Sequence, residues 1–410
     1  MLVIAIISTL SAIGLARFGY TMILPSMQKD LDLTNAQAGD IATGNFIGYL
    51  VFALVGGFLA TRFSHRRVIV IGLLLVGISM VLTATSSGFI SAVFWRTLTG
   101  MGSGCSNVPM MGLLSAWFSP KRRGFATGVA VMGSSLGLIV TGSLVPILLD
   151  TFGADGWRYA WGFLGGIVLI IALVTFIFLR DHPADKKTVP IGSNEDPTHR
   201  NNSRDADCSE SLSLLKSWSL VYKSGVVWGL ALIYVAFGFS YVIYVTFFAK
   251  YLEGEVGYSK EAAGRLWQIV GIISLFCGVI WGWISDTIGR SRALGVVCLI
   301  QGGAYLMFAL WDVPTGIILS AVLFGLTAWG IPAIMASACG DEFGPRLAPA
   351  TLGFVTLFLG IGQVLGPAVA GRISDFAGGS FVPAFIVAAA AAWLGAIGSL
   401  FLKHRPANAE

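Results

Sequence analysis

The sequence carries very little charge for its length. Of its 410 residues, 11% are charged and 55% are hydrophobic, whereas a soluble domain carries about 25% charged residues. So few charged side chains cannot cover a folded core in water, and this argues against a soluble globular protein. Most of the surface must therefore face lipid, and the bilayer is the first partner that the sequence predicts.

Histidines and paired cysteines are scarce as well. None of the four histidines, and no pair of acids, lies inside the long apolar segments. The five cysteines show no paired spacing, which argues against a disulfide framework or a zinc site. We therefore expect no catalytic residues, no metal and no cofactor, and a chain that is not an enzyme.

Long apolar runs dominate the chain instead. A run of about 20 apolar residues can cross a bilayer as a helix, and backbone groups in hydrocarbon must pair within their own segment. The sequence predicts an all-α membrane protein with twelve transmembrane helices. Their approximate ranges are 3–25, 38–60, 68–86, 89–116, 124–149, 157–180, 222–249, 262–284, 293–311, 315–339, 350–372 and 381–402.

Basic residues gather in alternate loops, which gives the orientation. With the N-terminus inside, the outer loops hold little more than Lys29, Arg158, Lys250 and Lys260. The positive-inside rule then predicts a multi-pass protein with both termini in the cytoplasm. This asymmetry also explains the pI of about 9.0 without a nucleic-acid partner. The predicted inner loops hold Arg62, Arg66, Arg67, Lys121, Arg122, Arg123, Lys186, Lys187, Arg200, Arg204, Lys216, Arg290, Arg292, Arg346, Lys403 and Arg405.

A polar segment divides the chain into two halves. Residues 181–221 are rich in Ser, Asn and Asp and predict a flexible cytoplasmic linker between six-helix bundles at 1–180 and 222–410. The halves repeat, because 34–67 aligns without a gap on 259–292, an offset of 225 residues (259 minus 34). Two such parallel repeats predict pseudo-symmetric bundles with a site between them near the membrane midplane.

Two motifs resemble those of the major facilitator superfamily. The segment from Gly282 to Arg292 closely resembles that family's signature loop, Gly-x-x-x-Asp-x-x-Gly-Arg-x-Arg, and Arg96 with the glycines up to Gly104 resembles its helix 4 motif. In the matching loop of the first half, Thr61 replaces the acid. The resemblance implies a rocker-switch transporter. Its inner gate would then use Arg62, Arg66, Asp286, Arg290 and Arg292, with Asp286, Arg290 and Arg292 as the chief latch.

A further resemblance concerns the first, sixth and eleventh predicted helices. The segments from Ala16 to Tyr20, Leu24 to Met27, Gly156 to Tyr159 and Gly362 to Pro367 resemble a bacterial branch near the cyanate, nitrate and monocarboxylate carriers. This resemblance implies a location in the bacterial inner (plasma) membrane. We expect the protein to act as a monomer.

Arg17 is the most informative polar residue within the apolar runs. A membrane-centre arginine costs at least about 2.5–3.5 kcal/mol, so it usually faces a cavity or a partner. At 100° per residue, Tyr20 and Thr21 share the face of Arg17, which predicts a clamp for a carboxylate or a similar oxyanion. The alternative is a structural ion pair with a neighbouring helix, through Asp40.

Other polar and aromatic side chains are candidates for the same site. Arg96 and Asn107 share a face of the fourth predicted helix, where Arg96 either takes part in proton movement or braces the helix. Tyr241, Trp329 and Gln363 are placed on helices 7, 10 and 11. Each is interpreted either as lining the cavity or as packing against a neighbouring helix.

The leading functional interpretation is secondary active transport of a small organic anion, monocarboxylate-like or a related oxyanion, by alternating access. Proton-coupled efflux of amphipathic compounds is the alternative. It would need a buried acid in the first half, where Asp40, near the outer surface, is the one candidate for proton coupling. A sensor on a transporter scaffold would need a larger output domain. Since no acid or histidine lies near the middle of a span, we expect anion exchange or a proton carried with the substrate.

Overall fold

The computed structural model describes residues 1–183, residue 191 and residues 222–402. Most of the predicted linker 181–221 therefore lies outside the described residues, and the division into 1–180, 181–221 and 222–410 stays a prediction. In the described part the regular structure is helical, apart from one isolated β-bridge between Phe118 and Ile191.

The first helices run from residue 2 to residue 178. They are α1 (Leu2–Thr9), the π-helical η1 (Leu10–Phe18), α2 (Gly19–Asp30), α3 (Asn35–Arg62), α4 (His65–Thr83), α5 (Phe89–Trp117), α6 (Pro120–Phe152), the short η2 (Gly153–Asp155) and α7 (Gly156–Phe178). The later helices follow residue 224. They are α9 (Gly225–Tyr251), η5 (Leu252–Val256), α10 (Lys260–Ser274), α11 (Cys277–Ile288), α12 (Arg290–Leu310), α13 (Pro314–Thr327), α14 (Gly330–Phe376) and α15 (Val382–Leu400).

The predicted fold class is confirmed. Nine helices of the described part are long and apolar enough to cross a membrane, or ten when α10 and α11, bent by 44° at their junction, count as one span. Among these nine, α6 and α7 form one continuous stretch from Arg122 to Phe178, and α5 is not included. All twelve predicted runs lie mainly in helical segments, while twelve separate membrane crossings stay a prediction.

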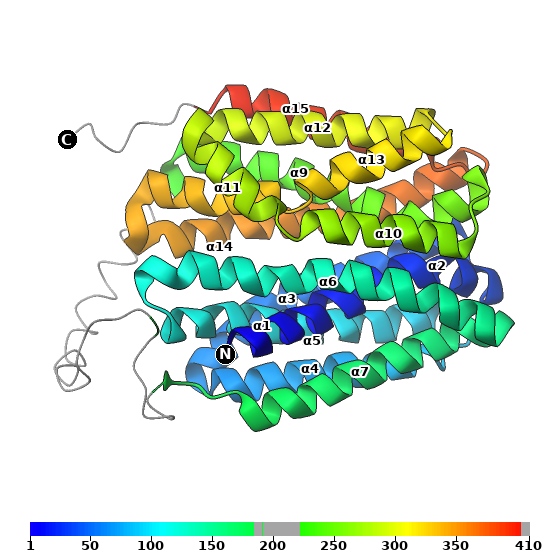
Figure 1. The fold of residues 1–410 in the computed structure, drawn as a ribbon, viewed down its shortest axis with the longest axis horizontal. Coiled ribbons are helices and arrows are strands. Elements are labelled where there is room, and N and C mark those ends of the chain that lie inside the picture. Colours follow the sequence, from blue (N-terminus) through cyan, green and yellow to red (C-terminus); the bar gives the residue numbers. More distant parts are fainter. Residues whose placement is uncertain (184–190, 192–221, 403–410) are drawn as a thin grey trace.

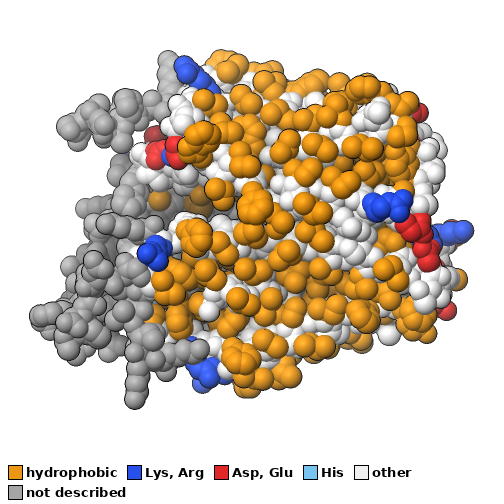
Figure 2. Space-filling model, viewed as in Figure 1, with side chains coloured by type: hydrophobic (Ala, Val, Ile, Leu, Met, Phe, Trp, Pro, Cys, Tyr) orange, Lys and Arg blue, Asp and Glu red, His pale blue; other side chains and the backbone are white. Residues whose placement is uncertain are grey.

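The surface is that of a multi-pass membrane protein. On the face seen in Figure 2, apolar side chains cover the middle and the charged ones gather toward the two ends. Large exposed apolar residues include Phe58, Ile71, Leu232, Trp283 and Leu394. A protein in water rarely exposes such a continuous apolar surface, whereas lipid tails match it.

The helices form two bundles that lie side by side (Figure 1). We call α1 to α7 the N bundle and α9 to α15 the C bundle. The linker end is the end where α7 finishes and α9 begins, and the far end is the end where α2 finishes. Between the bundles, α3 packs against α14 and α6 packs against α10.

The aligned positions of the two halves make equivalent contacts. Thr34 caps α3 and Ser259 caps α10, each with its side-chain hydroxyl. Gly39 of α3 lies against the backbone of Pro367 in the C bundle, and Gly264 of α10 lies against Gly142 in the N bundle. A Cβ at either glycine would collide with the opposite bundle, so both positions require the smallest residue for this close approach.

The contacts between the bundles run from the far end to the middle of the molecule. Asp375 accepts hydrogen bonds from the backbone N–H groups of Asn35 (3.0 Å) and Ala36 (2.9 Å). Further pairs are Arg372 with Asp40, Lys260 with Asp150, and Thr43 with the Val364 carbonyl. These described hydrogen bonds and ion pairs between the bundles lie from the far end to the middle of the molecule. The far end is therefore closed.

Candidate functional site

Arg17 lies at the interface of the two bundles, near the end of η1. Its guanidinium carbon is 4.6 Å from the ring centre of Phe46 and 4.7 Å from that of Tyr49, both on α3. It also interacts with the Tyr241 hydroxyl of α9. Two of its nitrogens, Nε and Nη2, are buried and have no hydrogen-bond partner among the described residues. Aromatic faces thus hold the cation while two of its donors stay free.

Asp40 does not pair with Arg17, so the predicted alternative for Arg17 is wrong. Asp40 binds Arg372 of the C bundle through both carboxylate oxygens, at 2.7 and 3.1 Å. Asp40 lies in the second turn of α3, whereas Phe46 and Tyr49 lie deeper, at the level that Arg17 reaches. Asp40 is thus part of the closed far end.

Arg96 braces the first helix from behind. Its side chain is 1% exposed, and Nη1 donates a 2.7 Å hydrogen bond to the Ala16 carbonyl. The guanidinium carbon lies 4.6 Å from the Trp161 ring centre and 5.2 Å from that of Tyr20. Because the π-helical segment frees carbonyls from the α-helical pattern, this contact stabilises the backbone directly before Arg17. The geometry favours the bracing interpretation.

Tyr20 does not flank Arg17 as predicted. Its hydroxyl donates to the Ala38 carbonyl at 2.8 Å, and its ring faces Arg96. The prediction counted 100° per residue, but η1 is π-helical and each of its residues advances by less. Thr21 is 1% exposed, in the buried core of the N bundle.

Two amide side chains bind tyrosines beside Arg17. Asn107 of α5 donates from Nδ2 to the Tyr49 hydroxyl at 3.1 Å, and Gln363 of α14 donates from Nε2 to the Tyr241 hydroxyl at 2.6 Å. Tyr49 also interacts electrostatically with Tyr241. The structure therefore brings four predicted site residues together, and Tyr49 connects them. These four are Arg17, Asn107, Tyr241 and Gln363.

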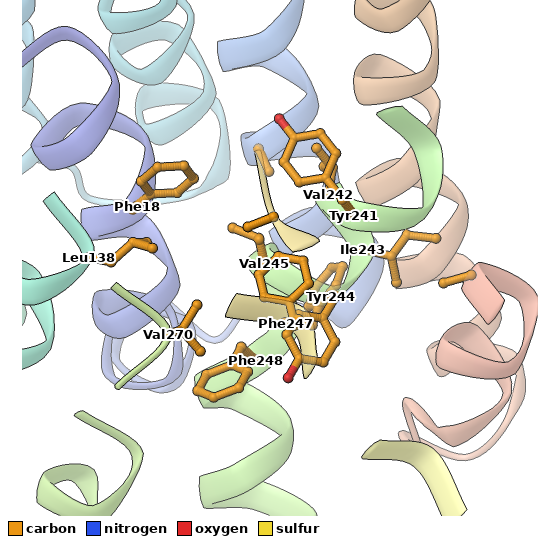
Figure 3. Close-up of a cluster of buried hydrophobic side chains, with 14 of the residues drawn as sticks. Phe18, Leu138, Tyr241, Val242, Ile243, Tyr244, Val245, Phe247, Phe248 and Val270 are labelled. Atoms are coloured by element: carbon orange, nitrogen blue, oxygen red, sulfur yellow. The ribbon is translucent and has the colours of Figure 1, made fainter. Parts of the chain in front are cut away.

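Aromatic packing fixes Tyr241 on α9. Below it on this helix, Tyr244, Phe247 and Phe248 belong to a buried cluster that also includes Phe18 of the N bundle (Figure 3). The Tyr244 ring centre is 4.5 Å from that of Phe324 and 4.7 Å from that of Phe308. Since α9 is anchored by these rings, the Tyr241 hydroxyl has a defined position next to Arg17.

Trp329 joins the bundles at a separate point. Its Nε1 donates to the Ser135 hydroxyl of α6 at 2.8 Å, and Ser274 of α10 donates to the same oxygen at 2.8 Å. Phe18 packs on the Trp329 ring, with centres 5.9 Å apart. Trp329 therefore contacts the opposite bundle, and no contact of the described residues links it to Arg17.

The predicted gate residues all lie at the linker end. Arg290 binds Asp286 at 2.5 Å and Asp341 at 2.7 Å, both within the C bundle. Arg62 and Arg292 are exposed. The described ion pairs of Arg290 stay within the C bundle, and the role of these residues as a latch stays a prediction.

Arg66 has a different anchor, which the sequence did not reveal. Its backbone N–H donates to Asp181 at 2.8 Å, and the Ser64 hydroxyl donates to the same carboxylate at 2.6 Å. Burial alone would raise the pKa of Asp181, but these hydrogen bonds and the nearby His65 lower it below its ordinary value. The acid missing at Thr61 is thus supplied from beyond α7.

Sequence reasoning missed Phe46 and Tyr49. Both lie in an apolar run in which aromatic residues usually pack against lipid or neighbouring helices, so composition gave no signal for a role beside Arg17. Their helical spacing offered a weak one, because residues three apart share a face. Among the described residues, no group of three or more His, Cys, Asp or Glu side chains could hold a metal.

The centre of the molecule is electropositive. Arg17 and Arg96 lie within electrostatic range of each other. In the described spans the acids, such as Asp30, Asp40, Asp150 and Asp286, lie at helix ends. Two nearby cations without a resident acid favour an anion between the bundles.

Comparison with known proteins gives one consistent answer. The family model described as Major Facilitator Superfamily matches residues 6–350. The probable sulfoacetate transporter SauU of Cupriavidus necator is 23% identical over 403 residues, which cover 94% of this chain and 90% of that protein. The hexuronate transporter of Bacillus subtilis is 25% identical, with 91% and 87% covered. The crystal structure of the D-xylose-proton symporter matches with a TM-score of 0.79 at 15% identity, covering 100% and 98%.

Proposed function

This chain belongs to the Major Facilitator Superfamily, and on that premise we propose that it carries a small organic anion with Arg17 as the principal contact. It is a secondary transporter of small organic substrates and not an enzyme. The finer assignment concerns the charge of the substrate and the way it crosses the membrane.

The free donors of Arg17 carry the proposal. Leaving buried N–H groups of a cation without acceptors is costly, and the two aromatic rings that face Arg17 do not supply them. A carboxylate or a similar planar oxyanion would accept from both nitrogens in a two-pronged arrangement. The names of the two relatives, which refer to sulfoacetate and hexuronate, support an acidic substrate.

The access route follows from where the bundles touch. If the linker end faces the cytoplasm, as the basic loops predict, the far end faces outward and is closed here. Arg17, Tyr49 and Asn107 are partly exposed, and the cytoplasmic side is then the one left open to them. Rocking of the bundles would engage Arg62, Arg66, Asp286, Arg290 and Arg292 and open the outer side. We infer a monomer in the bacterial inner membrane with cytoplasmic termini.

Coupling is proposed to use a second anion or a proton that arrives with the substrate. Arginine stays protonated, so a proton carried by the protein would need an acid near the site. Asp40, the one candidate, is held by Arg372 at the far end. The same pairing removes the acid that efflux of amphipathic compounds would require.

Counterflow tests this function. Purified protein in proteoliposomes loaded with lactate should accumulate labelled lactate from outside, with a trapped pH dye reporting protons. We expect uptake that depends on the internal anion. Substrate-independent proton leak, or loss of all coupling in Asp40→Asn, would show that the protein carries its own proton site. No counterflow with any carboxylate, sulfonate or inorganic oxyanion would refute the anion assignment.

A further inference from the structure

We propose that the substrate is a hydroxylated monoanion, an acid with one anionic group and a nearby hydroxyl. This inference rests on the proposed function and narrows it. It starts from Asn107, a residue of the candidate site that has no part in the proposed function.

Asn107 has an unsatisfied polar atom beside the anion contact. Its Nδ2 donates to Tyr49, but its Oδ1 is buried and has no hydrogen-bond partner among the described residues. An amide oxygen in this position, removed from water, lacks a donor. The site as a whole therefore offers free donors at Arg17 and one free atom at Asn107.

The same conclusion holds for either orientation of the amide. If the oxygen and nitrogen of Asn107 are exchanged, the oxygen accepts from Tyr49 and an NH2 group is left free. A hydroxyl can both donate and accept, so it satisfies Asn107 in both cases. A methyl or methylene group satisfies it in neither.

The spacing suits one small molecule. Arg17 stacks on the face of the Tyr49 ring at 4.7 Å, while Asn107 binds the hydroxyl at the end of that ring at 3.1 Å. The two groups are thus separated by little more than one tyrosine side chain. A substrate held at Arg17 can present a hydroxyl to Asn107 without leaving the interface.

A second anionic group is disfavoured at the Asn107 position. The other arginine near the centre, Arg96, is 1% exposed and already bound to Ala16, Tyr20 and Trp161. A second carboxylate or sulfonate would be taken out of water without a cation of its own, which is costly. The hydroxyl is the polar group that this side of the site accommodates.

Calorimetry with matched ligand pairs tests the inference. We would titrate purified protein with glycolate against acetate and with lactate against propionate. One added hydrogen bond corresponds to about a 2- to 12-fold gain in affinity for the hydroxylated partner. In Asn107→Leu this preference should disappear, so that glycolate binds as acetate does and lactate binds as propionate does.

Two controls keep the outcomes separate. Ser143→Ala changes an exposed hydroxyl that bonds its own helix and should keep the preference, and Asn107→Ala replaces Asn107→Leu if the leucine variant does not fold. A preference that survives in both Asn107 variants, or none in the parent protein, overturns the inference. If acetate and glycolate bind the parent protein equally and neither binds Arg17→Ala, this inference fails while the proposed function stands. If Arg17→Ala binds every ligand as the parent does, the proposed function fails too.

Discussion

Replacing Asp375 with asparagine should loosen the closed far end. Asp375, at the end of α14, accepts from the first two N–H groups of α3 in the opposite bundle. An anion at a helix N-terminus is also favoured by the helix dipole. Asparagine keeps the size, but it removes the charge and turns one acceptor into a donor that faces these N–H groups.

The magnitude follows from two exposed, charge-assisted hydrogen bonds. Buried bonds to a charged group contribute about 1.5–3 kcal/mol each, and the exposure of Asp375 reduces this, so that we take about 1–2 kcal/mol for both. Such a loss shifts the equilibrium between closed and open far ends about 5- to 30-fold. Asp150 of the N bundle contacts the start of α10 through Lys260 at 3.7 Å and also faces Glu261, a like charge, so Asp150→Asn should shift this equilibrium less.

Pulsed electron spin resonance measures this shift directly. Spin labels at Ser87 and Val313, exposed at the far ends of the N and C bundles, should show a larger fraction of long distances in Asp375→Asn. Asp155→Asn is the matched control, because among the described residues this far-end acid pairs with Arg158 of its own bundle. Equal distance distributions in the parent, Asp375→Asn and Asp155→Asn would refute this reasoning.

Three further predictions concern the brace and the linker end. Arg96→Leu should lower the melting temperature more than Arg96→Lys does, because losing the hydrogen bond and the ring contacts lowers the free energy of unfolding by about 1–3 kcal/mol. An unchanged melting temperature would argue against the brace. Asp181→Asn should lower the free energy of unfolding at neutral pH. This difference from the parent protein should vanish as pH falls through the pKa of Asp181, which lies below its ordinary value of 3.8. A difference between the melting curves that does not depend on pH would contradict this. Asp286→Asn should favour the conformation open at the linker end and slow transport with little effect on binding; unchanged cysteine labelling of the linker-end vestibule would oppose this role.

The sequence predicted the fold class and pointed to several residues of the candidate site because lipid makes polar groups conspicuous. Arg17, Asn107 and Gln363 stood out as costly side chains within apolar runs. The repeat likewise aligned Gly39 with Gly264, and both make close contacts between bundles. These signals depend only on local composition and spacing, which one sequence contains.

The contact partners of the polar residues could not be predicted from the sequence in the same way. Asp40 and its partner Arg372 are 332 residues apart, and only the packing of α3 on α14 brings them together. Arg17 lies in the π-helical segment η1, and this changed which residues share its helix face. Aromatic residues such as Tyr49 looked like ordinary packing residues. Asp181 was missed because it belongs to the polar segment after α7 and binds by tertiary contact.

Binding of lactate to Arg17 variants tests the central claim most directly. Isothermal titration should show that Arg17→Ala weakens binding at least about 100-fold, since two charge-assisted hydrogen bonds are lost. Arg17→Lys should keep part of the affinity as a point charge without the fork. Arg265→Ala, which removes an exposed arginine of α10, should bind as the parent does. If Arg17→Ala binds lactate and the other organic anions as tightly as the parent protein, Arg17 is not the anion contact.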